Sequence, residues 1–249
     1  METIVVDGNS SDDSPAIAAE MGVKLYRGSF RRSSARRFGA ENAAGEYLLF
    51  IDSDQTAGPT LLTECVELCE KTAVGAVRVP ERDVAKGIWA RVRRIDWTLT
   101  ESDEIWYPRF FSHPVYDSVG KHALALEDYM EDRDIYLRLI AKGVKIGRCE
   151  TPVFNQYGHF NPLEFGIKRG KAADDAVEYY KRNKKVDKSV WSVIRPRISR
   201  MVNSRVLSWK DIPFAYGLPA YVTVAYGPRL IRALRASRRA RLVATPSLD

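Results

Sequence analysis

The sequence has few cysteines, and their spacing does not suit a metal site. Its 249 residues include three Cys, and no two of them form a Cys-x-x-Cys pair. Cys65 and Cys69 are four residues apart on a predicted helix, with no second pair near them to complete a zinc site. We therefore expect Cys65, Cys69 and Cys149 to be free thiols that pack as small apolar side chains in a reducing compartment.

The sequence also lacks a long apolar run and a recognisable secretory leader. No stretch of 18 residues is uninterruptedly apolar, so no transmembrane helix is predicted. Residues 212–226 are mostly apolar, but Pro213, Gly217 and Pro219 interrupt them. Such a segment would lie in a membrane interface or pack on the body of the protein. We expect a cytoplasmic protein, either free or peripheral at the cytoplasmic face of the membrane.

The charge is unevenly distributed along the chain. From Lys184 onward there are 14 Lys and Arg against 3 Asp and Glu, a net charge of +11, whereas the preceding residues carry −4 of the total of +7. A basic tail favours an anionic partner, either a membrane surface or nucleic acid. Because the tail has no recognised nucleic-acid motif, we expect no nucleic-acid partner. We predict one α/β domain over residues 1–185 and a basic, partly apolar helical extension over 186–249.

The main candidate site follows a short apolar run. Residues 47–51 (Tyr-Leu-Leu-Phe-Ile) predict a strand buried on both faces, and Asp52 and Asp54 follow it. In extended backbone, two residues at this spacing project to the same side, and ligands of open α/β sheets bind beyond the carboxyl ends of strands. Two carboxylates there suit Mg²⁺ or Mn²⁺ carrying a diphosphate. The alternative for so short a motif is an acidic turn that caps the next helix.

Other charged residues are expected near this site. Residues 3–7 predict a strand that ends on Asp7, followed by a helix and a second strand. Four arginines crowd the start of a helix predicted over 33–44: Arg31, Arg32, Arg36 and Arg37. They form either a solvated basic face or a group of which one or two meet phosphates. Arg109, between aromatic residues of a predicted strand, either snorkels or clamps an anion.

The last candidates lie in the second half of the chain. Residues 127–134 contain five acids and open a helix that runs to Lys142. Acids at a helix N-terminus are stabilised by the dipole, but crowded acids also repel, and one with a raised pKa would suit proton transfer. Residues 155–160 predict a polar loop, in which His159 is either structural or a third metal ligand. We interpret His113 and His122 as structural.

Taken together, these blocks resemble the family-2 glycosyltransferases of the GT-A fold. Residues 5–12 (Val-Val-Asp-Gly-Asn-Ser-Ser-Asp) are similar to that family's first acidic turn. Residues 35–39 (Ala-Arg-Arg-Phe-Gly), 44–47 (Ala-Gly-Glu-Tyr) and 52–54 (Asp-Ser-Asp) resemble its Ala-Arg-Asn-x-Gly, Ala-x-Gly-Glu-Tyr and Asp-x-Asp blocks. Residues 131–143 resemble its Glu-Asp helix. The order and spacing of the blocks cover residues 3–182.

The resemblance implies a fold, an activity and a set of site residues. The fold is a Rossmann-like mixed sheet flanked by helices. The activity is inverting, metal-dependent transfer of a sugar from a nucleotide-sugar donor to a hydroxyl of a glycan or lipid-linked acceptor, with Mg²⁺ or Mn²⁺ as cofactor. The implied roles are a catalytic base (Asp132), donor contacts (Asp7, Asp52, Arg36), metal ligands (Asp52, Asp54, His159) and the acceptor or phosphate side (Arg109, Glu131). A second alignment places Asn155 where the first places His159.

The chain departs from this family at its start. It begins about where the family's second strand is expected, so we expect the sheet to lack its first strand. Two other functions therefore stay open. One is a non-catalytic, glycosyltransferase-like binding protein. The other is a binder of membrane surfaces or nucleic acid that acts through the basic tail.

Overall fold

A computed structural model describes residues 1–84, 107–126, 130–156 and 179. Almost all of them belong to one compact unit, formed by Met1–Arg82 and Trp106–Asn155. The second unit, and with it the predicted domain boundary and tail, lies almost entirely outside the described residues. Within the described part, no helix has both the length and the apolar character needed to cross a membrane. The three cysteines are free and buried, as expected.

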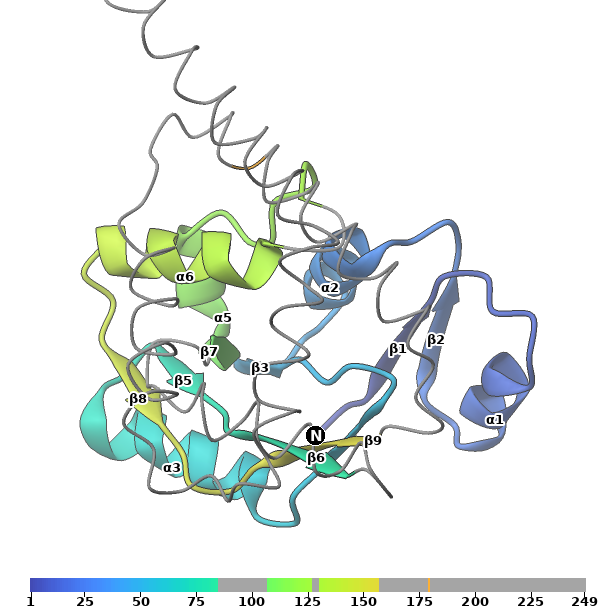
Figure 1. Cartoon of the computed structure of the whole chain (residues 1–249), viewed down its shortest axis with the longest axis horizontal. Helices are drawn as coiled ribbons and strands as arrows, with labels where there is room; N and C mark the ends of the chain where they lie inside the picture. Colours follow the sequence, from blue (N-terminus) through green and yellow to red (C-terminus); the bar gives the residue numbers. More distant parts are fainter. Residues whose placement is uncertain (85–106, 127–129, 157–178, 180–249) are drawn as a thin grey trace, which may run out of the picture. The chain divides into compact units, whose positions relative to one another are not determined.

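The chain begins with the β-α-β unit that the sequence predicts. β1 (Ile4–Asp7) and β2 (Lys24–Arg27) pair in parallel, with α1 (Ser14–Glu20) between them in the sequence (Figure 1). Pro15 lies in the first turn of α1, where its missing N–H costs no helical hydrogen bond. Gly22 follows the helix with φ of +65°, a conformation that favours glycine. Asp7 is the last residue of β1, at the carboxyl end of the strand.

The next helix carries a buried arginine. α2 (Arg32–Glu41) packs against β1 and buries Ser33, Arg36 and Ala40. Their spacing of three and four residues places them on one face of the helix. A buried guanidinium requires charged partners, because an unpaired charge is costly to remove from water.

The central sheet is mixed and has four strands in the order β3-β7-β5-β8. β3 (Tyr47–Leu49) and β5 (Ala76–Arg78) both run antiparallel to β7 (Pro108–Ser112). β5 runs parallel to β8 (Ile146–Arg148). A mixed α/β sheet flanked by helices is the predicted fold class.

Each face of this sheet buries its own core, because neighbouring residues of a strand point to opposite faces. Val77 and Phe110 pack with α3 (Leu61–Thr72). Ala76 and Phe111 pack with residues of α5 (His113–Ser118) and α6 (Glu131–Ala141). Figure 1 shows α3 on one side of the strands and α5 and α6 on the other.

A second small sheet adjoins the turn that carries the acidic pair. Its strands are β4 (Gln55–Ala57), β9 (Val153–Gln156) and β6 (Glu81–Val84), in the order β4-β9-β6. β4 and β9 are antiparallel, with Gln55 opposite Asn155. The polar loop predicted from residue 155 is therefore wrong at its first two residues, which extend β9.

The prediction for residues 47–54 also needs correction. β3 ends at Leu49, and only Leu48 of its three residues is buried. Tyr47 and Leu49, on the opposite face, are only half-buried against the other core, so the strand is not fully buried on both faces. Among the described strands β3 lies at the edge of its sheet. The extended backbone expected for Asp52–Asp54 is wrong as well, because the N–H of Gln55 donates to the carbonyl of Asp52 over 2.9 Å and closes a turn.

Candidate active site

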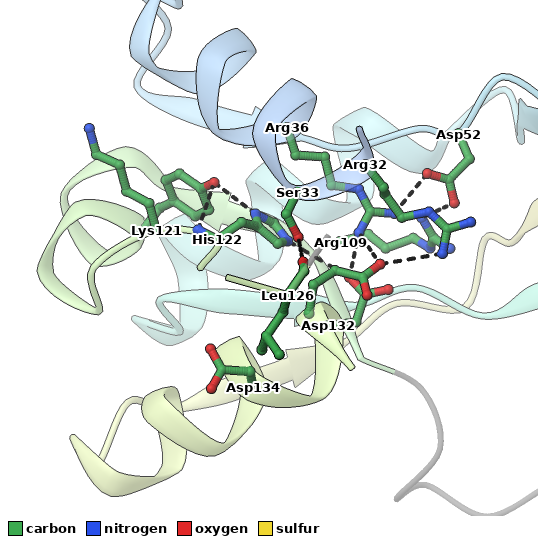
Figure 2. A network of polar contacts seen from close by, with 12 residues as sticks. Arg32, Ser33, Arg36, Asp52, Arg109, Lys121, His122, Leu126, Asp132 and Asp134 are labelled. Carbon is green, nitrogen blue, oxygen red and sulfur yellow. Dashed lines mark hydrogen bonds and ion pairs between the residues drawn. The ribbon is translucent and has the colours of Figure 1, made fainter. Parts of the chain in front are cut away.

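Arg36 joins carboxylates from two distant parts of the chain. Its Nη2 lies 2.7 Å from Oδ1 of Asp52, in the turn after β3. Its Nη1 lies 2.6 Å from Oδ1 of Asp132, in the first turn of α6 (Figure 2). Because the guanidinium is planar and presents its donors in a fixed fork, one arginine holds the two carboxylates at a set separation. Three residues predicted for the site thus lie in one network.

Asp132 is held in its ionised form. Burial alone would raise its pKa, but the charge of Arg36 and the proximity of His122 outweigh this effect and keep the pKa well below its usual range. The positive end of the α6 dipole acts in the same direction. The side chain is still 27% exposed, so an ionised carboxylate remains within reach of solvent.

Glu131, the neighbouring acid, has the opposite character. Its side chain is 2% exposed, and its Oε1 lies 3.3 Å from Nη1 of Arg32 and 3.4 Å from Nη1 of Arg36. Burial, followed by the charge of Asp132, raises the pKa of Glu131 to about 7. Of these two adjacent acids, Asp132 is therefore the one that is charged and accessible at neutral pH.

A closed ring of hydrogen bonds fixes the other side of Asp52. Oδ2 of Asp52 accepts from Nη1 of Arg109 over 3.2 Å, and Nη2 of Arg109 donates to Oε1 of Glu81 over 2.6 Å. Glu81 Oε2 accepts from Asn155 over 3.2 Å, and Asn155 Oδ1 accepts from Gln55 over 2.7 Å. The ring closes where the backbone N–H of Asp52 donates to Gln55 Oε1 over 3.1 Å. Side chains from β4, β6, β7 and β9 thereby hold the Asp52 turn.

The two arginines also control the charge of Asp52. Burial on its own would raise the pKa of Asp52, but Arg36 and then Arg109 reverse the effect and lower it. Both oxygens of Asp52 therefore carry negative charge and face guanidinium groups. Two guanidinium groups thus bind one carboxylate in the turn that follows β3.

His122 lies on the far side of Asp132 from Asp52, in the segment between α5 and α6 (Figure 2). Its side chain is 2% exposed, and its Nε2 lies 3.8 Å from Oδ1 of Asp132. Its Nδ1 lies 2.7 Å from the hydroxyl of Tyr116. Burial lowers the pKa of His122, so its imidazole is neutral at physiological pH.

The remaining predicted residues lie outside this network. Asp7 is buried at the end of β1, where contacts with Ser10 and then Arg27 lower its pKa. Asp54 is exposed and makes no ion pair within the described residues. His159, the predicted third metal ligand, lies outside those residues. Asn155, the alternative to His159, is 5% exposed and bonds through both ends of its amide.

The donor atoms present fit a hard divalent cation only in part. No three His, Cys, Asp or Glu side chains are grouped for a metal ion in the portion of the chain that the structure describes. Asp54 offers an exposed carboxylate of the kind that Mg²⁺ and Mn²⁺ prefer. Each oxygen of Asp52 already accepts a hydrogen bond from an arginine, so a cation bound there would compete with two guanidinium groups.

Sequence reasoning missed the residues that support the network. Arg32 was named only as one member of a basic cluster, although its spacing of four from Arg36 places both on one helix face. No sequence pattern marks Glu81 as a partner of Arg109, because its position depends on the pairing of β6 with β9. No pattern marks Tyr116 either, and His122 was interpreted as structural without a partner. The pairing of these two side chains is visible only once α5 and α6 are packed.

Comparisons with known proteins support a single family. The glycosyl transferase family 2 model matches residues 1–126. A beta-monoglucosyldiacylglycerol synthase of Trichormus variabilis is 26% identical over 117 residues, which cover 43% of this chain. The match spans only 24% of that relative's own length.

One solved structure shows the same fold. A mannosyltransferase of Pyrobaculum calidifontis, solved with GDP-Man and Mn²⁺, aligns with a TM-score of 0.54 at 16% identity, covering 98% of this chain and 67% of that one. TarS of S. aureus, solved with UDP-GlcNAc, aligns with a TM-score of 0.49 at 16% identity, covering 95% and 78%. The family model covers just over half of the sequence, and the sheet and its flanking helices agree with it. The chain belongs to glycosyl transferase family 2.

Proposed function

We propose that this chain transfers a sugar from a nucleotide-sugar donor to an acceptor hydroxyl, with inversion at the anomeric carbon. The observation that carries the proposal is the Asp132 carboxylate, which is ionised, partly exposed and joined through Arg36 to Asp52. A carboxylate with these properties can accept a proton from a hydroxyl as that hydroxyl attacks. Family membership supports the same reaction class.

The proposed step balances as a direct displacement. The acceptor oxygen forms a bond to the anomeric carbon while the bond from that carbon to the diphosphate breaks. The acceptor proton passes to Asp132, and the electron pair leaves with the diphosphate. The transition state has oxocarbenium character, as in other glycosyl transfers. Because attack and departure occur on opposite faces, the configuration inverts.

On the donor side we propose roles for Asp7, Asp52 and Arg36. Asp7 is the last residue of β1 and Asp52 lies in the turn after β3, and ligands of α/β sheets bind beyond strand ends of this kind. Arg36 and Arg109 both contact Asp52, and either could exchange that carboxylate for a phosphate. Such an exchange would carry the donor's diphosphate into the network that holds Asp132.

We also propose a divalent cation, Mg²⁺ or Mn²⁺, held by Asp54 with Asp52 and His159 as further ligands. When bound, it would neutralise charge on the leaving diphosphate. The Mn²⁺ and GDP-Man in the Pyrobaculum calidifontis structure favour these ligand classes for this chain as well. The name of the Trichormus variabilis relative, a beta-monoglucosyldiacylglycerol synthase, favours a lipid acceptor over a glycan acceptor.

A membrane surface is the further partner that we propose, contacted through residues 186–249. The net charge of +11 from Lys184 onward supports it, and it would place the chain at the cytoplasmic face. Flotation with anionic and with zwitterionic vesicles tests it. We expect binding to anionic vesicles, and we expect salt to weaken this binding. The triple substitution Arg235, Arg238 and Arg239→Gln should reduce it more than the control Arg37→Gln. Equal binding to both vesicle types would contradict it.

Product formation tests the proposed reaction directly. The full chain is incubated with Mn²⁺, a panel of UDP- and GDP-sugars, and glycan or lipid-linked acceptors. We expect transfer from one donor class, with the product's anomeric configuration opposite to that of the donor by NMR. A retained configuration would refute inversion. No transfer and no thermal shift with any donor would favour a non-catalytic binding protein instead.

A further inference from the structure

The described part of the structure contains a buried chain of polar groups of which the proposed reaction uses only the last. It runs from Tyr116 on α5, through His122, to Asp132 on α6. All of Tyr116 and nearly all of His122 is shielded from solvent. Buried polar groups of this kind destabilise the fold unless each one has a hydrogen-bond partner. Their contacts therefore indicate which atoms carry the protons.

The tautomer of His122 follows from the hydrogen bonds of Tyr116. The tyrosine hydroxyl accepts a hydrogen bond from the backbone N–H of His122 over 3.2 Å and lies 2.7 Å from Nδ1. If Nδ1 carried the proton, the hydroxyl would accept two bonds and its own proton would be buried with no partner among the described residues. If the hydroxyl donates to Nδ1, the hydroxyl and Nδ1 are both satisfied. The proton of the imidazole is then on Nε2.

The second ring nitrogen gives the same answer independently. Nε2 of His122 faces Oδ1 of Asp132 at 3.8 Å. A lone pair on Nε2 would be repelled by an ionised carboxylate, whereas an N–H is attracted to it. At 3.8 Å the contact is too long for a hydrogen bond, but contacts at catalytic groups often shorten when substrate binds.

The segment that carries His122 is anchored at both ends. Nη2 of Arg138 donates to the carbonyl of Lys121 over 2.7 Å. On the other side, the hydroxyl of Ser33 donates to the carbonyl of Leu126. The imidazole also meets the ring of Phe50 edge to face, with centroids 5.2 Å apart. His122 therefore has little freedom to turn away from Asp132.

The charged groups around His122 keep it neutral. Asp132 faces it from α6 and favours the protonated form, whereas Arg36 from α2 and Arg138 from α6 oppose it, and burial opposes it most. The hydroxyl of Tyr116 stays a donor, because burial raises its pKa to about 12. The N–H of a neutral imidazole can orient a carboxylate and leave its negative charge uncompensated. The positive charge of an imidazolium would compensate it.

We propose that His122 is a positioning residue for Asp132. Its neutral imidazole, fixed in the Nε2–H form by Tyr116, directs this N–H to Oδ1, the same oxygen that Arg36 holds. Within the described residues both contacts face Oδ1, so Oδ2 is left to accept the proton of the acceptor. The part of this inference that concerns transfer rests on the proposed function. The tautomer and its link to Asp132 do not.

Nitrogen NMR of the full chain tests the inference without any activity. With ¹⁵N-labelled histidine, His122→Gln identifies the signals of His122 and His113→Gln identifies those of the control histidine, which contacts the carbonyl of Gly45. We expect a protonated Nε2 and an unprotonated Nδ1 for His122, unchanged between pH 5.5 and 8.5. We also expect Asp132→Asn to move the Nε2 signal of His122 but not that of His113.

Either of two spectra would overturn the inference. One is a His122 that carries its proton on Nδ1 or becomes an imidazolium in this pH range. The other is a His122 whose Nε2 signal ignores Asp132→Asn. An enzyme that proves inactive with every donor would refute the proposed function and leave these spectra to decide the inference.

Kinetics then separates positioning from packing. His122→Phe keeps a ring against Phe50 but removes the N–H, and His122→Gln keeps an N–H donor at the position of Nε2. In the Phe variant we expect kcat to fall at least about tenfold, which is a part of the rate enhancement of about 10²–10⁴ that a positioned base contributes. The KM for the donor should not change. In the Gln variant kcat should be largely restored. Equal loss in both variants, or no loss in the Phe variant, would overturn it.

Discussion

Gln55 and Asn155 lie directly opposite each other in the antiparallel pair β4–β9, and their side-chain amides are hydrogen-bonded over 2.7 Å. The pair links the turn that carries Asp52 to a strand one hundred residues later. Its outer ends bond to the backbone N–H of Asp52 and to the carboxylate of Glu81. The position of Asp52 is therefore decided by a ladder of amides as well as by its two arginines.

Breaking this ladder should destabilise the domain. Asn155→Leu keeps the approximate volume but leaves Gln55 Nε2 and Glu81 Oε2 without this partner. We expect the free energy of unfolding to fall by about 1–3 kcal/mol, the usual cost of unsatisfied buried polar groups. Urea denaturation measures it, with Asn42→Leu as the control, because the side-chain amide of Asn42 donates to the carbonyl of Phe38 in its own helix. A loss no larger than that of the control would contradict the role given to the ladder.

Removing the guanidinium of Arg36 should be more costly. Arg36→Met leaves Asp52, Asp132 and Glu131 close together without their shared cation, and breaking buried ion pairs of this kind costs about 3–5 kcal/mol. The loss should shrink as the pH falls, because protonation relieves the repulsion among the carboxylates. The control Arg37→Met removes an exposed pair with Glu41, which is expected to cost less than about 0.5 kcal/mol. Similar losses in the two variants would refute the prediction.

The buried acid Glu131 gives a pH dependence of the opposite sign to that of most carboxylates. Its pKa rises from 4.5 to about 7 on folding, so folding takes up a proton between these values. Its contribution to stability is complete below pH 4.5 and is lost as the pH rises toward 7. Gln imitates the neutral acid at every pH.

The stability difference between Glu131→Gln and the natural chain should therefore grow with pH. The expected slope is up to about 1.4 kcal/mol for each pH unit between about pH 5 and 7, favouring the variant. Thermal and urea unfolding at four pH values measure it, with the exposed Glu67→Gln as the control. A difference that is constant across this range, or that shrinks, would show that Glu131 is ionised throughout.

Asp132→Asn should separate binding from chemistry. Because the amide cannot accept the acceptor's proton, we expect transfer to fall by about 10²–10⁴. Donor binding, followed by thermal shift, should persist because the Asp52 side of the network remains. Asp117→Asn, at an exposed acid of α5, is the matched control. Loss of donor binding together with transfer would assign Asp132 a structural role.

Asp54→Asn tests the proposed cation site. The side chain is exposed and unpaired within the described residues, so stability should change by no more than about 0.5 kcal/mol. Mn²⁺ affinity, measured by electron paramagnetic resonance, should fall at least about tenfold, the loss that even outer-shell changes cause. Asp12→Asn, at an exposed acid near α1, is the control. Unchanged Mn²⁺ affinity would show that Asp54 is not a ligand.

The sequence predicted best where structure depends on local signals. β1, α1 and β2 follow from short apolar runs, Pro15 and Gly22, which act within a few residues. α6 follows from its acidic first turn and apolar spacing. β4 and β6 were missed, because residues such as Gln55 and Glu81 form strands only through their pairing with β9. The edge position of β3 is likewise a property of the assembled sheet.

The site shows the same limit. Asp52, Arg36 and Arg109 were singled out from their sequence context, the family resemblance gave roles to these three and to Glu131 and Asp132, and the structure brings all five into one network. Their pairing was not predicted, because salt bridges between residues 16 to 96 positions apart leave no spacing pattern. The difference between Glu131 and Asp132 was also hidden, because it arises from burial. The boundary at residue 185 and the missing first strand stay predictions.

The alternation along β7 limits how this family member could change by insertion. Phe111 belongs to the core on one face of the strand and Phe110 to the core on the other, and the register against β5 shifts by one residue at Arg109. One further residue that shifted the pairing of Phe110 and Phe111 would exchange the two cores. Length variation among relatives should therefore be absent within residues 108–112 and accumulate in the connections on either side, where no such exchange of faces is imposed.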